Sequence, residues 1–306
     1  MDATLRAISE GIATMRDQMT MRDPECLYAL AFVPLERLEG VLLDPFAPIM
    51  REIQHHPDLD SLFFVRFSEP RWQIRFRVLG RREWVGGALR DRLRACLTGL
   101  EESGRIETFQ FARYDRELER YGGEAGMALA ERLFFADSMA AIELCEADRR
   151  GVLRKSRREI ALLLVDRMLD LAHLDPARRL AFYRHGYAWA LEDGFWNEAD
   201  LQLLEARFQQ NLAGFRRLFE DAPGGAELWG GDEAAAIAQG FLERAAPILA
   251  TIVGEQAAGR VHQELVYLLW SYAHMFTNRM GIDSGAEAIL RFWMHRYLQE
   301  RRAMAV

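Results

Sequence analysis

Residues 61–79 read Ser-Leu-Phe-Phe-Val-Arg-Phe-Ser-Glu-Pro-Arg-Trp-Gln-Ile-Arg-Phe-Arg-Val-Leu, and this stretch decides the fold of the first part of the chain. Two runs rich in aromatic and branched residues, 61–67 and 72–79, flank the turn-forming residues 68–71. Aromatic and β-branched residues favour strands, and a short polar segment containing proline favours a turn between them. The stretch therefore predicts an antiparallel hairpin.

The side chains of this hairpin divide into two sets, because residues two apart on a strand share a face. In 72–79 the apolar set is Trp72, Ile74, Phe76 and Val78, and the polar set is Gln73, Arg75 and Arg77. In 61–67 the apolar set is Phe63, Val65 and Phe67, with Arg66 opposite. We therefore predict a sheet with one face packed on helices and another face that carries Arg66, Gln73, Arg75 and Arg77.

An arginine-lined face has two interpretations. Arginines on a strand are usually solvated surface residues. Guanidinium groups also present paired donors that suit carboxylates and phosphates. Since a helical second half has to cover part of the sheet, the pattern favours a covered, anion-binding cleft.

The segments on either side of the hairpin complete an α+β pattern. Residues 25–33 and 105–114 are rich in strand formers, and residues 36–56 and 83–103 have helical spacing of apolar residues. The order β-α-β-β-α-β is that of a ferredoxin-like sheet. Helices are expected at 123–148, 154–173, 177–193, 198–219, 233–253, 258–279 and 284–302. We predict a ferredoxin-like region over 1–122 and a helical region over 123–306, packed together as one integrated domain.

Composition narrows the class of protein. The 306 residues carry a formal charge of −7, which argues against general nucleic-acid binding. The cysteines, Cys26, Cys96 and Cys145, form no CxxC pair and read as buried small side chains rather than metal ligands. The first twenty residues lack the apolar core of a signal peptide, and no apolar run looks long enough to span a bilayer. We expect a cytoplasmic protein with no membrane contact.

Four stretches, in this order, carry a family resemblance. They are Phe-Phe-Val-Arg-Phe-Ser-Glu-Pro at 63–70 with Ile-Arg-Phe-Arg at 74–77, Tyr-Asp-Arg-Glu-Leu-Glu-Arg-Tyr-Gly-Gly at 114–123, Phe-Phe-Ala-Asp-Ser at 134–138, and His-Met-Phe-Thr-Asn-Arg-Met-Gly at 274–281. Together they resemble the C-terminal domain of lantibiotic dehydratases, also met as the thiopeptide-type bacteriocin biosynthesis domain. The resemblance departs from the family pattern at Gln73, where the family usually has His, and at Glu69, where it usually has Asp.

The resemblance implies a reaction and its partners. In the family this domain removes glutamate from glutamylated Ser or Thr of a precursor peptide, which leaves dehydroalanine or dehydrobutyrine. Full dehydratases also carry a larger domain that transfers glutamate from glutamyl-tRNA. The resemblance here implies the split arrangement, with a separate transferase as partner and the precursor peptide as substrate. A homodimer is left open.

The same resemblance implies a catalytic set. Arg75, Arg77 and Arg120 match the family's catalytic arginines, and His274 matches the family's histidine. An imidazole titrates near neutral pH and can carry a proton in either direction. If the stretch around Glu117 is helical, this residue shares a face with Arg120 and can orient it. Taken singly, these residues would read as a surface ion pair and a core histidine.

Further residues are expected to contact substrate. We assign Arg66, Gln73, Asn278 and Tyr272 to this role. Two other readings stay open. The fold also carries pyridine synthases of thiopeptide pathways, which close a macrocycle by a formal cycloaddition and release the leader peptide, and Tyr272 is placed where it could serve a cyclase. A non-enzymatic reading is a peptide-binding subunit that presents substrate to a transferase.

The chain carries no nucleotide or metal motif, so the reaction is expected to need no cofactor and no metal. We predict that exhaustive EDTA treatment leaves the release of glutamate from a glutamylated peptide unchanged, as followed by mass spectrometry. Loss of activity that a metal ion restores is the contrary result.

Overall fold

The computed structural model describes residues 24–220 and 225–304, so the expectations for residues 1–20 lie outside the described residues. Four antiparallel strands form one sheet in the order β2-β3-β1-β4. The strands are β1 (Pro24–Phe32), β2 (Leu59–Phe67), β3 (Gln73–Arg81) and β4 (Thr108–Ala112). This is the ferredoxin-like order, and the α+β prediction is confirmed.

Each of the two early helices contains a wide turn that the sequence did not reveal. The first consists of α2 (Leu35–Val41), the π-helical η1 (Leu42–Phe46) and α3 (Ala47–Ile53), with Pro45 inside η1. The second consists of α4 (Arg82–Trp84), η2 (Val85–Leu89) and α5 (Arg90–Glu102), and Gly87 in η2 has non-helical backbone angles. Proline cannot donate the regular helical hydrogen bond, which accounts for the wider turn in η1. The Phe46 ring lies 5.0 Å from that of Phe76, which places the apolar side of β3 against the first helix.

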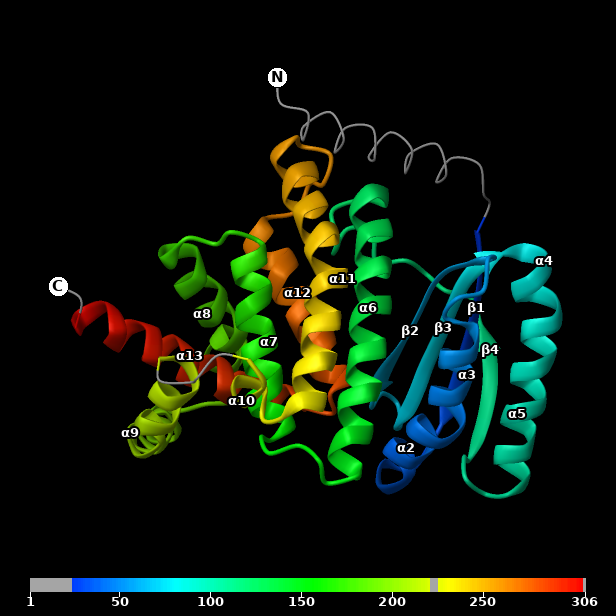
Figure 1. Ribbon diagram of the computed structural model, residues 1–306, viewed down its shortest axis with the longest axis horizontal. Coiled ribbons are helices and arrows are strands. Elements are labelled where there is room, and N and C mark those ends of the chain that lie inside the picture. Colours follow the sequence, from blue (N-terminus) through cyan, green and yellow to red (C-terminus); the bar gives the residue numbers. More distant parts are fainter. Residues whose placement is uncertain (1–23, 221–224, 305–306) are drawn as a thin grey trace.

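The second half is helical, as expected, and lies beside the sheet (Figure 1). Its helices are α6 (Glu124–Arg149), α7 (Arg157–Leu171), α8 (Pro176–Glu192), α9 (Glu198–Phe219), α10 (Ala226–Trp229), α11 (Asp232–Ala257), α12 (Leu265–Arg279) and α13 (Ser284–Met304). The predicted helix 258–279 begins too early, because Gly259 adopts φ +70° just after α11 and residues 258–264 form a connection. One hydrophobic cluster continues from the sheet into these helices.

The helices α6 and α12 meet the sheet along its outer strand, β2. Ser61 donates its hydroxyl to the backbone oxygen of Glu131 in α6 at 2.6 Å, and Ser138 accepts the amide of Phe64 at 3.4 Å. The Asn278 side chain of α12 bonds both backbone groups of Arg66, at 3.0 and 2.8 Å. On the arginine face itself, Phe63 lies opposite Arg77 and packs on Phe134 of α6 at 5.4 Å, so the helices cover this face only at its β2 end, less than expected. The loop 113–121 crosses part of that face, and its Tyr114 ring lies 6.2 Å from the ring of Tyr28.

The register of the hairpin shows that one of the four residues predicted on the arginine face, Arg66, lies on the other face. Residues directly opposite each other in an antiparallel pair share a face. Val65 lies opposite Arg75 and Phe63 opposite Arg77, whereas Arg66 lies opposite Ile74. Arg66 is therefore on the helix-packed side of the sheet. The alternation was misread because β2 is apolar on both sides, with every residue from Leu62 to Val65 buried.

One helix tests the expectation about membranes. By length and composition alone, α11 is long and apolar enough to cross a bilayer. The expectation that no apolar segment is long enough to span a bilayer is therefore wrong for this helix. This helix packs against α6 and α7, and its buried residues include Phe241, Leu249 and Ile252.

Candidate active site

Arg75 and Arg77 project from β3 on the face opposite the early helices, and aromatic rings hold both guanidinium groups. The Cζ atom of Arg77 lies 4.4 Å from the ring centroid of Tyr28 and 4.7 Å from that of Tyr114. The Cζ atom of Arg75 lies 3.3 Å from the ring centroid of Phe67. Ring faces attract cations without using their N–H donors. The buried Nε atoms of both arginines have no hydrogen-bond partner among the described residues, which leaves donors for an anion.

The pKa of Arg75, on the sheet, is affected by Glu117 in the loop that follows β4. Burial lowers the pKa of Arg75, Tyr28 opposes this, and the neighbouring Arg77 lowers the pKa further. The carboxylate of Glu117 acts in the other direction and raises it. The net pKa of Arg75 is below the ordinary value, chiefly because burial disfavours the charged guanidinium and secondarily because Arg77 lies nearby.

Glu117 and Arg120 form the predicted pair, although not on a helix. Residues 113–123 are irregular and turn-like, and Arg120 Nη1 donates to Glu117 Oε2 at 3.0 Å within this loop. Arg120 Nε donates to the hydroxyl of Ser271 in α12 at 3.3 Å. Burial opposes the charge of Arg120, but Tyr121 and Glu117 outweigh burial and raise its pKa. The loop thus fixes a cation against the helical region.

His274 is held by a carboxylate that the sequence did not single out. Its Nδ1 lies 2.7 Å from Oε2 of Glu287, and Oε1 of Glu287 accepts from Arg291 Nη2 at 3.1 Å. The side chains of Glu287 and Arg291 are 5% and 1% exposed. Burial alone would raise the pKa of Glu287, but His274 and Arg291 outweigh it and hold the pKa at about 2. Because a carboxylate only accepts, Nδ1 carries the proton and Nε2 is left for other partners.

Arg120 and His274 lie in one cleft of about 780 Å³ between α8 and α12. Its walls include Tyr267, Trp270 and Trp189, and the ring of Trp270 stacks on that of His274 at 5.8 Å. Arg75 and Arg77 do not line this cleft, although the carboxylate of Glu117, which pairs with Arg120, also acts on the charge of Arg75. The structure therefore brings a cation and an imidazole together in a concave, aromatic-walled site.

Three residues expected to contact substrate have structural partners instead. Gln73 lies on the arginine face, but its amide donates to the backbone oxygen of Glu69 at 2.6 Å and thereby holds the hairpin turn. Asn278 bonds the backbone of β2. Tyr272 is fully buried and stacks on Tyr121 at 5.7 Å, outside the residues that line the cleft. The contacts of Gln73, Asn278 and Tyr272 with substrate remain predictions, and the structural partners of these side chains do not support them.

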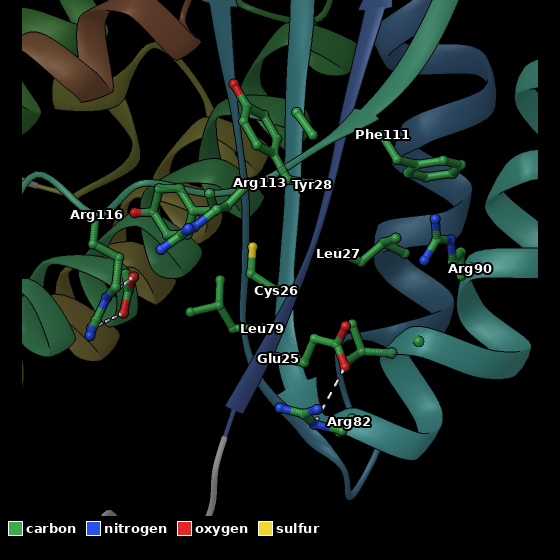
Figure 2. A pocket seen from close by; sticks show the side chains of 15 residues that line it. Glu25, Cys26, Leu27, Tyr28, Leu79, Arg82, Arg90, Phe111, Arg113 and Arg116 are labelled. Carbon is green, nitrogen blue, oxygen red and sulfur yellow. Dashed lines mark hydrogen bonds and ion pairs between the residues drawn. The ribbon is translucent and has the colours of Figure 1, made fainter.

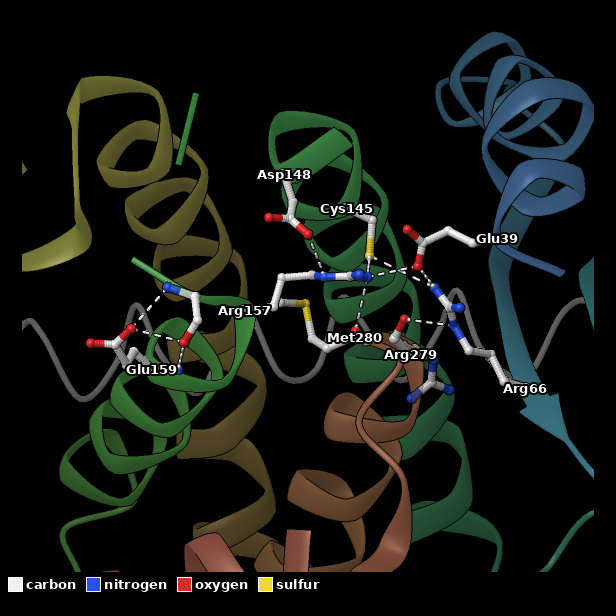
Figure 3. Close-up of polar contacts among 9 residues, drawn as sticks. Glu39, Arg66, Cys145, Asp148, Arg157, Glu159, Arg279 and Met280 are labelled. Atoms are coloured by element: carbon white, nitrogen blue, oxygen red, sulfur yellow. Dashed lines mark hydrogen bonds and ion pairs between the residues drawn. The ribbon is translucent and has the colours of Figure 1, made fainter. Parts of the chain in front are cut away.

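Arg66 belongs to a separate polar cluster where the sheet meets the helices (Figure 3). Its Nη2 lies 3.3 Å from Oε2 of Glu39, and its Nε donates to the backbone oxygen of Arg279 at 3.2 Å. Arg157 contacts the same Glu39 oxygen at 2.7 Å and the sulfur of Cys145 at 3.2 Å. Arg66 thus connects β2 to α2, α6, α7 and α12, which is a structural position away from the cleft.

Two residues near His274 were missed, and one left a signal in the sequence. A helix break was expected at Gly281. His274 and Glu287 lie at equal distances on either side of this break, six residues before Met280 and six residues after Gly281. A hairpin of helices about that break brings such positions side by side. His185, which had no motif, also lines the cleft, and its ring lies 4.8 Å from that of Trp270. Burial lowers the pKa of His185.

Solved structures share this fold over most of the chain. The tRNA-dependent lantibiotic dehydratase MibB from Microbispora sp. 107891 matches with a TM-score of 0.69 and 22% identity, over 92% of this chain and 28% of that one. TsrL matches with a TM-score of 0.65 and 19% identity, over 92% of this chain and 96% of that one. The pyridine synthase TbtD from thiomuracin biosynthesis matches with a TM-score of 0.62 and 16% identity, over 90% and 98%. These likenesses establish the fold.

A match over most of the chain establishes the family, and two sequence relatives agree with it. The subtilin biosynthesis protein SpaB of Bacillus subtilis is 32% identical over 166 residues, which are 54% of this chain and 16% of SpaB. The nisin biosynthesis protein NisB of Lactococcus lactis subsp. lactis is 29% identical over 115 residues, 37% of this chain and 11% of NisB. The chain thus spans a small part of both relatives. Residues 27–298 match the family described as "Lantibiotic biosynthesis dehydratase C-term". The chain belongs to this family of lantibiotic biosynthesis dehydratase C-terminal domains.

Proposed function

We propose that this protein removes glutamate from glutamylated Ser or Thr residues of a ribosomal precursor peptide. The observation that carries the proposal is the shared cleft of Arg120 and His274, with Glu117 paired to Arg120 at 3.0 Å. The reaction needs a group that takes a proton from Cα, cations that stabilise the developing enolate, and donors that hold the departing glutamate. The residues of this site offer each of these.

In the proposed reaction, Nε2 of His274 takes the Cα proton of the glutamylated residue. The electron pair of the broken C–H bond forms the enolate, collapses into the Cα–Cβ double bond, and breaks the bond from Cβ to the ester oxygen. Glutamate leaves as a carboxylate, and the peptide retains dehydroalanine or dehydrobutyrine. Guanidinium groups with unused donors, as on Arg75 and Arg77, suit the carboxylates and the enolate oxygen.

Glu287 acts in this proposal as a positioning residue for His274. Its carboxylate fixes the proton on Nδ1 and stabilises the imidazolium that forms when Nε2 takes a proton. Against burial, the contact with His274 and then the charge of Arg291 hold the pKa of Glu287 at about 2, so the carboxylate stays ionised beside the imidazole. Because this pKa is depressed, the stability contributed by the ionised carboxylate is present above the ordinary carboxyl range and is lost only as pH falls towards 2.

We predict that Glu287→Gln lowers kcat for glutamate release by roughly 10- to 100-fold, with KM nearly unchanged. Glutamine still accepts a hydrogen bond but cannot stabilise the imidazolium. The rates are measured by mass spectrometry on a glutamylated peptide, and ¹⁵N spectra of the histidine ring report whether Nδ1 still carries the proton.

Arg291→Met is the matched control, since it removes the other buried charge of the pair and leaves the contact between His274 and Glu287 in place. This variant is expected to retain kcat within several-fold. Equal losses in both variants, or an unchanged kcat in Glu287→Gln with a normal circular-dichroism spectrum, contradict the positioning role.

We also infer the setting in which the reaction occurs. The substrate is a precursor peptide already glutamylated by a separate transferase that uses glutamyl-tRNA, and the protein works in the cytoplasm. Membership of the dehydratase family supports this setting. Co-purification of a tagged copy with such a transferase would test the partnership directly.

A pyridine synthase is the second candidate, favoured by one observation. The chain matches TsrL and TbtD over 96% and 98% of their lengths. Tyr272, which the cyclase reading would use, is buried outside the cleft. Two mass-spectrometry assays separate the candidates. Elimination predicts loss of glutamate from a glutamylated peptide, whereas cyclisation predicts no such loss, together with release of the leader from a peptide that already carries dehydroalanines.

A further inference from the structure

The strand β1 is paired along only part of one side. On the side of β3 it is paired along its whole length, from Pro24 to Phe32. On the other side β4 pairs with residues 28–32 alone, and no other strand within residues 24–220 and 225–304 continues that ladder. Backbone groups at such an edge are ready to pair with an extended chain. Residues 24–27 of β1 therefore offer a short edge for a strand from another molecule.

A cleft of about 750 Å³ lies along this edge, between the start of α5 and the loop that follows β4 (Figure 2). Its charged lining residues are Arg82, Arg90, Arg113, Arg116, Glu25 and Glu131, an excess of two positive charges in a chain whose formal charge is −7.

The arginines of this cleft differ in their availability. Arg116 is committed to Glu131 through two hydrogen bonds of 2.9 and 2.7 Å. Arg90 is exposed, lies 5.2 Å from the ring centroid of Phe111, and forms no ion pair with any described carboxylate. Arg113 pairs with Asp115 at 3.4 Å on a fully exposed surface, where such a pair is weak. Arg90 and Arg113 are therefore the cations best able to meet a ligand's carboxylates.

The cleft is connected to the candidate active site by two tyrosines. Tyr28 and Tyr114 line it, and the same two rings hold the guanidinium of Arg77 at 4.4 and 4.7 Å. A peptide that lies along residues 24–27 of β1 would thus lead directly to the arginine face of the sheet.

We propose that this β1-edge cleft binds an extended, acidic segment of the peptide substrate, away from the residue that reacts. The segment adds a strand to residues 24–27 and places its carboxylates against Arg90 and Arg113. The assignment of the segment to a substrate rests on the proposed function, whereas binding of an acidic extended peptide does not. Backbone hydrogen bonds contribute affinity that does not depend on the peptide's sequence. The arginines select for acidic side chains.

The test uses fluorescence anisotropy of the full chain with a labelled synthetic peptide rich in Asp and Glu. We expect Arg90→Glu to weaken binding roughly tenfold at low salt, with a smaller effect at high salt. Arg207→Glu is the matched control, because Arg207 is an exposed arginine on α9, far from the sheet, and is expected to bind as the wild type does (Figure 1). Equal weakening in both variants overturns the proposal.

A second peptide separates strand addition from simple charge attraction. The same sequence with alternate backbone amides methylated keeps every carboxylate but loses half of its donors, and it is expected to lose most of its affinity. Unchanged binding of this peptide overturns the strand geometry. The proposed function is tested separately. If the wild-type protein binds the acidic peptide in a way that depends on Arg90 but releases no glutamate from a glutamylated peptide, the binding cleft is supported and the elimination reaction is refuted.

Discussion

Replacing His274 with alanine is expected to lower the rate of glutamate release by roughly 100- to 10,000-fold, the range of a lost general acid or base. The imidazole is the titratable group that Glu287 orients in the cleft, and Arg120 lies in the same cleft as a fixed cation. Binding of the glutamylated peptide should persist, because the arginines hold its carboxylates. Rates come from mass spectrometry and binding from anisotropy of a labelled substrate.

His185→Ala provides the control from within the same cleft. Both histidines flank Trp270, but among residues 24–220 and 225–304 no carboxylate hydrogen-bonds His185 as Glu287 does His274. Its replacement should change the rate by only a few-fold. If His274→Ala releases glutamate at the rate of the wild type, or if His185→Ala shows the larger loss, the role given to His274 is incorrect.

Arg75→Lys is expected to impair elimination nearly as much as Arg75→Ala, by roughly 100-fold or more. A lysine keeps the charge but loses the planar, paired donors, and it cannot lie flat on the Phe67 ring as the guanidinium does at 3.3 Å. Both kcat and kcat/KM should fall, because the interaction is expected to strengthen as the enolate forms.

Arg71→Lys is a matched control for this change. Arg71 also lies over a ring, 4.3 Å from the centroid of Phe32, but it is half exposed and pairs with Glu107 at 2.9 Å. The rate should stay within about twofold of the wild type, as for a surface ion pair. If Arg75→Lys retains most of the activity, positive charge alone is sufficient and the paired-donor explanation fails.

The strand order and the polar face of β3 could be predicted from the sequence because they depend on local alternation. Gln73, Arg75 and Arg77 share a face in the structure as expected. Arg66 was misplaced because the register of β2 depends on burial of both its faces, which a single strand does not reveal. The covering of the sheet was also misjudged, since helix packing at an edge leaves no periodic signal.

Residues of the candidate site could be predicted from the sequence only where they lie within the recognised motifs. Glu117 and Arg120 form their pair in a turn rather than on the expected helix, because spacing of three residues brings side chains together in both geometries. Glu287 and Arg291 lie on α13, shortly after the last motif, and His185 lies on α8, far from it in sequence; only the packing of these helices brings the three residues to His274. Long-range contacts of this kind cannot be derived from local spacing.

The hydrogen bonds that seal the outer edge of β2 bear on how such a chain can be recombined with its relatives. Ser61, Ser138 and Asn278 reach across the seam between sheet and helices and satisfy backbone groups there. An exchange of the sheet region alone would leave an unsealed strand in every chimera whose new helices lack matching polar side chains. The unit to exchange is therefore the sheet together with α6 and α12, so that the seam is carried intact.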